Sequence, residues 1–127
     1  MRSDITKRFH YLVVDDSEFA RKSLIKLLDH IGGTLSGEAA SGNDALLKYR
    51  SLKPDIVFMD VNMPGMEGID ALEHILREDR GAKVVIVSSL SHGSLVKDAM
   101  EKGAKHFITK PVQNVPLDRI VRFVLNH

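Results

Sequence analysis

One stretch decides the fold of this chain: residues 11–17, which read Tyr-Leu-Val-Val-Asp-Asp-Ser. Four apolar residues are followed at once by two carboxylates and a serine. A short apolar run with a polar end is typical of a strand that is covered on both faces of a parallel sheet. The serine can cap a helix that follows directly. The stretch therefore predicts a strand, a polar strand end and a helix in immediate succession.

The same pattern of an apolar run with a polar end returns further along the chain. The runs and their polar ends are 56–59 with Asp60, 84–87 with Ser88, and 107–109 with Lys110. In an open parallel α/β sheet, ligands bind at the edge formed by the carboxyl ends of the strands. We therefore expect one site that gathers three carboxylates, from Asp15, Asp16 and Asp60, with a hydroxyl and an ammonium group.

Segments with helical periodicity lie between the apolar runs. Their apolar residues recur at i, i+3 and i+4 spacing, and capping residues, glycines or prolines bound them. The expected helices are 18–31, 45–52, 68–78, 95–102 and 115–125, with a strand at 34–40 and a turn at 41–43. Phe19 is expected on the buried face of the first helix. Alternating strands and helices with right-handed crossovers predict an α/β fold with a doubly wound, parallel, five-stranded sheet.

Length and composition restrict the class of protein. The 127 residues, 43% of them hydrophobic, suit one domain over 1–127, with a core at about 9–126 and an N-terminal extension at 1–8. The formal net charge of +1 indicates no basic field for nucleic acid. The chain has no cysteine, and no apolar stretch approaches the ~20 residues of a membrane span. We expect a cytoplasmic protein without membrane insertion or direct contact with nucleic acid.

The charges of the expected site determine its chemistry. Three carboxylates within ~5 Å of one another would repel by ~3 kcal/mol per pair at an effective dielectric near 20, so they need a counter-charge. Oxygen ligands without His or Cys favour a hard ion such as Mg²⁺, which binds carboxylates, water and phosphate oxygens. Lys110 adds a positive charge for a phosphoryl oxygen, and Ser88 adds a hydroxyl donor. These residues predict an acidic phosphoryl-transfer site, in which one carboxylate could be the nucleophile.

Four motifs, in this order along the chain, resemble the receiver domain of two-component response regulators. They are Val13-Val14-Asp15-Asp16-Ser17, the run 59–68 (Met-Asp-Val-Asn-Met-Pro-Gly-Met-Glu-Gly), Val87-Ser88-Ser89 and Lys110-Pro111. The likeness spans nearly the whole chain and includes stand-alone chemotaxis-type receivers. It implies a flavodoxin-like (βα)5 fold and a phosphoryl donor that is a histidine kinase or a histidine phosphotransfer protein. It also implies a protein effector that binds the face of the fourth helix, fifth strand and fifth helix.

The resemblance also implies roles for individual residues. Asp60 would accept the phosphoryl group, and Lys110 would bind it. The Mg²⁺ ligands would be Asp16, Asp60 and the backbone carbonyl of Asn62, with Asp15 bound through water. Ser88 would be the switch hydroxyl in place of the commoner threonine, which keeps the hydroxyl without the β-branch. Phe107 would be the aromatic switch residue in place of the frequent tyrosine, and it cannot form a hydrogen bond through a phenolic oxygen.

Two alternatives to a stand-alone receiver remain open. One is a small Mg²⁺-dependent aspartyl phosphatase of the haloacid dehalogenase type. That class usually needs Asp-x-Asp on one strand, whereas here the paired acids are adjacent and the expected nucleophile lies on another strand. The other alternative is the excised receiver of a longer response regulator or hybrid kinase. As a receiver the chain would not be an enzyme with a separate substrate. Turnover of a phosphate monoester would therefore distinguish the phosphatase from a receiver. The length of the gene would show whether the receiver is part of a longer protein.

Overall fold

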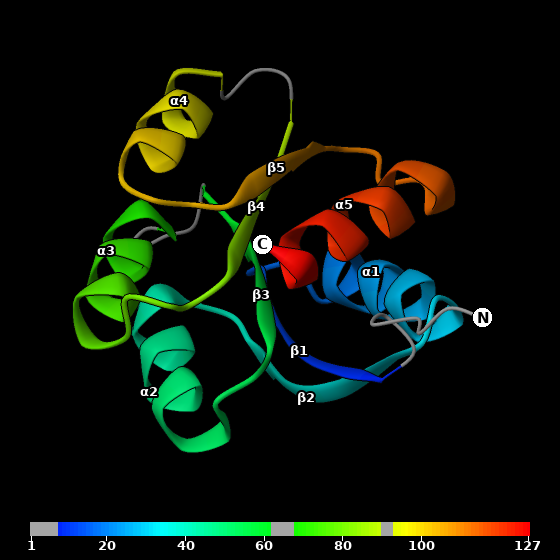
Figure 1. Ribbon diagram of the computed structural model, residues 1–127, viewed down its shortest axis with the longest axis horizontal. Coiled ribbons are helices and arrows are strands. Elements are labelled where there is room, and N and C mark those ends of the chain that lie inside the picture. Colours follow the sequence, from blue (N-terminus) through cyan, green and yellow to red (C-terminus); the bar gives the residue numbers. More distant parts are fainter. Residues whose placement is uncertain (1–7, 62–67, 90–92) are drawn as a thin grey trace.

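The computed structural model describes residues 8–61, 68–89 and 93–127, in which strands and helices alternate (Figure 1). The strands are β1 (Phe9–Val14), β2 (Gly33–Ala39), β3 (Ile56–Asp60), β4 (Val84–Ser88) and β5 (His106–Thr109). The helices are α1 (Glu18–His30), α2 (Gly42–Leu52), α3 (Gly68–Glu78), α4 (Gly93–Glu101) and α5 (Asn114–Asn126). The alternation of five strands and five helices that the sequence predicts is confirmed.

All five strands are parallel and form one sheet in the order β2-β1-β3-β4-β5. Helices α1 and α5 cover one face of the sheet, and α2, α3 and α4 cover the other (Figure 1). The strand order reverses between β1 and β3, so the helices that follow these two strands leave on opposite faces. Such a switch point opens a crevice at the carboxyl ends of the strands. The doubly wound sheet is therefore confirmed, and its crevice lies where the sequence places the polar residues.

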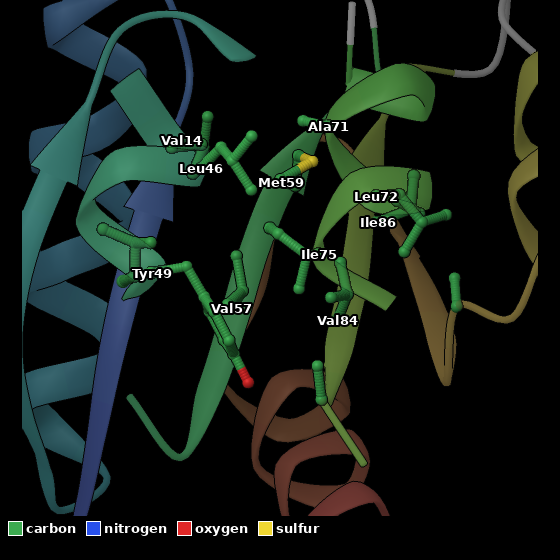
Figure 2. Packing of buried hydrophobic residues seen from close by; sticks show 14 of the residues in the cluster. Val14, Leu46, Tyr49, Val57, Met59, Ala71, Leu72, Ile75, Val84 and Ile86 are labelled. Carbon is green, nitrogen blue, oxygen red and sulfur yellow. The ribbon is translucent and has the colours of Figure 1, made fainter. Parts of the chain in front are cut away.

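Two apolar clusters, one on each face of the sheet, hold β3 at the centre of the molecule. Val57 and Met59 face the cluster that contains Leu72 and Ile75 of α3 (Figure 2). Phe58, between them in sequence, belongs to the opposite cluster with residues of α1 and α5. Because successive strand residues point to opposite faces, a strand covered on both sides needs apolar residues at every position. This packing fixes the end of β3, where Asp60 lies.

The start of α2 differs from the sequence prediction. The helix begins at Gly42 rather than at Ala45, so residues 41–43 are not a separate turn. The side-chain oxygen of Ser41 accepts a hydrogen bond from the backbone N–H of Asp44 at 3.2 Å. This contact is a helix N-cap, and it satisfies a donor that the first helical turn would otherwise leave free.

The prediction that Phe19 is buried is wrong. The residue is 82% exposed, whereas α1 buries Leu24 and Leu28. Steps of four residues back from Leu28 lead through Leu24 to Ala20, which is half-buried. Phe19 precedes Ala20 by one position and is therefore turned away by about 100° around the helix axis. An aromatic side chain is thus left on the surface in the first turn of α1.

The longest helices in the described ranges are α1 and α5, with 13 residues each. A helix needs about 20 predominantly apolar residues to cross the hydrocarbon core of a bilayer. In residues 8–61, 68–89 and 93–127, no helix has both the length and the apolar character for such a crossing.

Candidate functional site

Three aspartates meet at the carboxyl edge of the sheet. Asp15 and Asp16 follow β1, and Asp60 ends β3, the strand that pairs with β1. One carboxylate oxygen of each residue lies within 4.8 Å of the others. Asp15 and Asp60 are buried, and Asp16 is exposed. The pairing of two neighbouring strands therefore brings together the three carboxylates that the sequence analysis groups.

Lys110 reaches this acidic cluster from the loop after β5. Its Nζ lies 3.0 Å from Oδ2 of Asp15. The backbone N–H of Lys110 donates to the carbonyl oxygen of Ser88 at 2.8 Å, which ties the end of β5 to the end of β4. The peptide bond from Lys110 to Pro111 is cis. A positive charge is thus held beside the buried carboxylate of Asp15.

Ser88 and Phe107 share a small cavity at the same edge of the sheet. Ser88 is buried at the end of β4, and its hydroxyl donates to the carbonyl oxygen of Ser89 at 3.1 Å. Phe107, on β5, is 42% exposed. A cavity of about 200 Å³ is lined by both residues and by Val96 of α4. The structure therefore places the two predicted switch residues around one space that a side chain could enter.

The acidic cluster fits a magnesium ion. Its donors are carboxylate oxygens alone, which suit a hard cation. The negative charge of three carboxylates exceeds the single positive charge of Lys110, so the cluster suits a divalent cation. The exposure of Asp16 leaves access for the water molecules that Mg²⁺ retains. Asn62, the other predicted ligand, lies outside the described residues.

Arg21 of α1 holds the loop that carries the paired aspartates. Its Nη1 donates to the carbonyl oxygen of Asp15 at 2.8 Å, and its Nε donates to Glu38 of β2 at 2.8 Å. Glu38 also accepts a hydrogen bond from Lys22 at 2.7 Å. The hydrogen bonds from Lys22 and from Arg21 hold the pKa of Glu38 below its usual value. Sequence reasoning misses this contact, because it depends on how α1 lies across β2.

Replacing Arg21 by alanine should destabilise the protein by about 1 kcal/mol and weaken Mg²⁺ binding several-fold, because the Asp15 carbonyl loses a charged donor. Arg21 also pairs with Glu38, and protonation of Glu38 removes the charge of that pair. The lowered pKa of Glu38 corresponds to stability that is present above the pKa of the unfolded chain and is lost as pH falls through the folded value. The stability difference between the variant and wild type should therefore shrink at low pH. Urea unfolding across pH measures this, with exposed Lys26→Ala on the same helix as the control. A difference that grows at low pH contradicts the assignment.

An apolar cavity adjoins the acidic cluster on the α1 side. Its volume is about 500 Å³, and Asp15, Lys110 and Phe19 contribute to its wall. The remaining wall is mostly apolar and comes from the sheet, from α1 and from the loop after β5. Among these residues are Val13, Leu24, Leu27, Phe58, Val87 and Pro111. An exposed aromatic ring and an apolar hollow therefore lie beside the carboxylates.

Comparison with known proteins identifies the family. The family model of the response regulator receiver domain matches residues 11–122. The chemotaxis protein CheY of Thermotoga maritima is 44% identical over 102 residues, which cover 80% of this chain and 85% of that protein. CheY of Treponema pallidum is 45% identical over 106 residues, 82% of this chain and 74% of that protein. The crystal structure of the CheX–CheY–BeF3–Mg²⁺ complex from Borrelia burgdorferi matches with a TM-score of 0.86 and 39% identity, over 91% of this chain and 88% of that chain. With its strand-end aspartates and this degree of likeness, the chain belongs to the family of response regulator receiver domains.

Proposed function

We propose that this chain is a phosphorylation-controlled switch in which Asp60 accepts a phosphoryl group from a histidine kinase or a histidine phosphotransfer protein. One observation carries the proposal: the carboxylates of Asp15, Asp16 and Asp60 meet within 4.8 Å at the end of buried strands. Membership of the receiver family supports it, as does the likeness to a Borrelia CheY whose crystal structure is a complex with BeF3 and Mg²⁺. The whole chain would act as one receiver domain, with its core at about 9–126.

In the proposed reaction, a carboxylate oxygen of Asp60 attacks the phosphorus atom of a phosphohistidine. A P–O bond forms as the P–N bond breaks, and the imidazole nitrogen keeps the electron pair of the broken bond. The product is an acyl phosphate on Asp60. Asp15, Asp16 and Asp60 would hold Mg²⁺, with Asn62 as a further ligand inferred from the sequence alone. When bound, Mg²⁺ offsets charge on the phosphoryl oxygens. The ammonium of Lys110, now 3.0 Å from Asp15, is free to turn to a phosphoryl oxygen.

Acetyl phosphate provides the test of this proposal, because it donates a phosphoryl group without a partner protein. Incubation with acetyl phosphate and Mg²⁺ should add one phosphoryl group, which hydroxylamine removes because it is an acyl phosphate. Chelation of Mg²⁺ should abolish the addition. Addition at an unchanged rate without Mg²⁺ contradicts the proposal. Steady turnover of p-nitrophenyl phosphate would instead favour the aspartyl phosphatase, whereas a receiver should show none.

The partners that we propose are proteins in the cytoplasm. The formal net charge of +1 provides little attraction for the phosphate backbone of nucleic acid. A protein effector would bind the face formed by α4, β5 and α5. Phe107 and Phe123 leave apolar surface exposed on this face, since the two residues are 42% and 49% exposed. The effector would therefore gain contact area from aromatic side chains that are already on the surface.

The exposed ring of Phe19 leads to a prediction about the phosphoryl donor. A donor protein must bring its histidine to Asp60, and Phe19 lines the apolar cavity beside that route. Phe19→Ala should slow phosphoryl transfer from the cognate histidine kinase about tenfold, the size of effect seen when a central aromatic contact is lost. Transfer from acetyl phosphate should change far less. Leu47→Ala is the control, because Leu47 is 60% exposed on α2, on the other face of the sheet. Equal slowing with both phosphoryl donors contradicts this role.

Ser88 and Phe107 are proposed to connect the acyl phosphate to the effector face. The new phosphoryl oxygens are strong acceptors, and they should draw the Ser88 hydroxyl away from the carbonyl oxygen of Ser89. This rotation would free space in the cavity of about 200 Å³ that Phe107 also lines. Phe107 could then move inward and change the surface between α4 and α5. A coupling free energy of ~1–3 kcal/mol is expected for such a two-state change.

Two substitutions separate the switch from the phosphorylation reaction. Ser88→Ala should still accept a phosphoryl group but shift poorly to the active conformation. Phe107→Ala should change effector affinity more than the phosphorylation rate. Amide chemical shifts with and without beryllofluoride provide the measurement. If the shifts stay near Asp16, Asp60 and Lys110 and never reach α4 or β5, this switch mechanism is wrong.

A further inference from the structure

A groove with four cationic side chains lies between α3 and the turn from α4 into β5. Its volume is about 610 Å³. Arg77 and Arg80 come from the end of α3 and the residues after it, and Lys102 and Lys105 come from the turn. Lys105 directly precedes β5, at the amino end of that strand, whereas Asp60 lies at the carboxyl end of β3. In a parallel sheet these ends are opposite, so this cationic groove is separate from the acidic cluster.

The acidic side chains around the cationic groove already have partners. Glu73 pairs with Lys102 at 3.2 Å, Glu78 with Arg50 at 2.9 Å, and Asp79 accepts from the hydroxyl of Tyr49 at 2.7 Å. Three of the four cationic side chains, in contrast, lack such a partner among the residues that the structure describes. Arg77, Arg80 and Lys105 are exposed, and their side chains form no ion pair or hydrogen bond with any residue that the structure describes. Three positive charges on one groove are therefore left for a ligand.

The floor of the groove depends on a close approach of the turn to α3. Gly103 has φ +118, and a Cβ atom at this position would lie 2.8 Å from Cδ1 of Leu76. Glycine is the residue that adopts this backbone conformation and this approach without strain. Leu76, which also lines the groove, provides an apolar part of its wall next to Gly103.

We propose that the cationic groove binds an acidic segment of a partner protein, independently of phosphorylation. The guanidinium groups of Arg77 and Arg80 would each take a carboxylate, because a planar guanidinium matches a carboxylate through two parallel hydrogen bonds. Lys105 would take a further carboxylate as a point charge. An aliphatic side chain of the segment would lie on Leu76. The occupant is thus a short run of Asp and Glu that contains an aliphatic residue.

Other anionic ligands match the groove less well. Among the residues that the structure describes, no aromatic ring lines the groove, so the base of a nucleotide would have no stacking partner there. A formal net charge of +1 for the whole chain does not support binding along a nucleic acid backbone. The cations line a shallow groove between a helix and a turn, and such a groove suits an extended peptide segment better than the flat headgroup layer of a membrane. The acidic segment therefore remains the occupant that charge and shape favour.

Fluorescence anisotropy with a defined peptide tests this proposal on the 127-residue chain in its unphosphorylated state. The probe is fluorescein-labelled Gly-Asp-Glu-Leu-Glu-Asp-Gly, and its neutral counterpart is Gly-Asn-Gln-Leu-Gln-Asn-Gly. The acidic probe should bind, the neutral one should not, and affinity should fall as salt rises from about 0.05 to 0.3 M because exposed charges are screened. The double variant Arg77→Glu/Arg80→Glu should lose at least about tenfold in affinity.

A matched charge reversal separates the groove from overall charge. Lys26→Glu/Arg119→Glu makes the same change at exposed positions of α1 and α5, on the other face of the sheet, and should keep the affinity. Lys105→Ala provides a milder change within the groove and should weaken binding two- to fivefold, roughly the effect of one exposed ion pair. Circular dichroism verifies the fold of each variant.

Three results overturn the proposal: no binding of the acidic probe, equal binding of the neutral probe, or equal losses in the two double variants. Binding to phosphatidylglycerol vesicles without binding of the peptide also overturns it and assigns the groove to a membrane surface. None of these measurements involves Asp60 or Mg²⁺. Failure here therefore leaves the phosphorylation proposal untouched, and failure of phosphorylation leaves this one standing.

Discussion

Asp60→Asn should accept no phosphoryl group from acetyl phosphate and should be more stable than the wild-type protein when Mg²⁺ is absent. The amide that replaces the carboxylate is a poor nucleophile, so labelling should fall to background. The stability gain has an electrostatic cause. Asp60 lies within 4.8 Å of the carboxylates of Asp15 and Asp16, and each of these two pairs repels by ~3 kcal/mol at an effective dielectric near 20. Solvent screening at the exposed Asp16 and the lost attraction to Lys110 reduce the net gain to ~1–2 kcal/mol.

Mg²⁺ should reverse the order of stability for the same reason. The ion stabilises the folded protein more strongly the tighter it binds, and the variant offers one ligand charge fewer. Thermal unfolding with and without Mg²⁺ measures both effects, and mass spectrometry measures labelling. Asp70→Asn is the control, because Asp70 is exposed in the first turn of α3 and does not belong to the acidic cluster. Persistent Mg²⁺-dependent labelling of the Asp60 variant at the wild-type rate would show that another residue is the acceptor.

The strands were predictable because their environment leaves little choice of residue. A central strand covered on both faces must be apolar throughout, and this makes the segments that become β1, β3 and β4 easy to recognise. Helix α3 was also predictable to its ends, since Ile69, Leu72 and Ile75 form a clear buried stripe. The site follows from these elements, because parallel strands bring their polar ends to one edge. Strand ends alone therefore sufficed to group the three carboxylates.

The parts that the sequence left open depend on contacts between distant segments. Ser41 favours a turn and a helix cap by the same hydrogen-bonding chemistry, so only the fold shows that it caps α2. Phe19 fits the helical apolar spacing, yet the direction of α1 over the sheet leaves it exposed. The contacts of Arg21 with Asp15 and Glu38 require α1, β1 and β2 to meet. No local pattern encodes such a meeting, because it is set by strand order.

The close contact of Gly68 with the end of β3 also could not be predicted from the sequence. Substitution of this glycine should have a large effect on stability and on phosphorylation. Turn chemistry would be a sufficient reason for a glycine before a helix. The structure provides a stronger one, because α3 begins directly against the backbone at the end of β3. A Cβ atom on Gly68 would lie 2.2 Å from the carbonyl oxygen of Asp60 and 2.9 Å from Cα of Val61. Both atoms belong to the backbone of a buried strand end, so neither can rotate away as a side chain would.

Gly68→Ala should therefore destabilise the protein by about 2–3 kcal/mol and displace the start of α3 from Asp60. Because in-line attack needs reacting atoms held in a narrow geometry, phosphorylation by acetyl phosphate should slow by at least about tenfold. Urea unfolding and the rate of labelling measure the two effects. Gly93→Ala is the matched control for stability, since Gly93 is the first residue of α4 and a Cβ atom there would meet nothing within 4 Å. Alanine is the better helix former, so this control should be as stable as wild type or up to about 1 kcal/mol more stable. If both substitutions leave stability unchanged, α3 can move from the end of β3 at little cost, and the position of Asp60 does not depend on this contact.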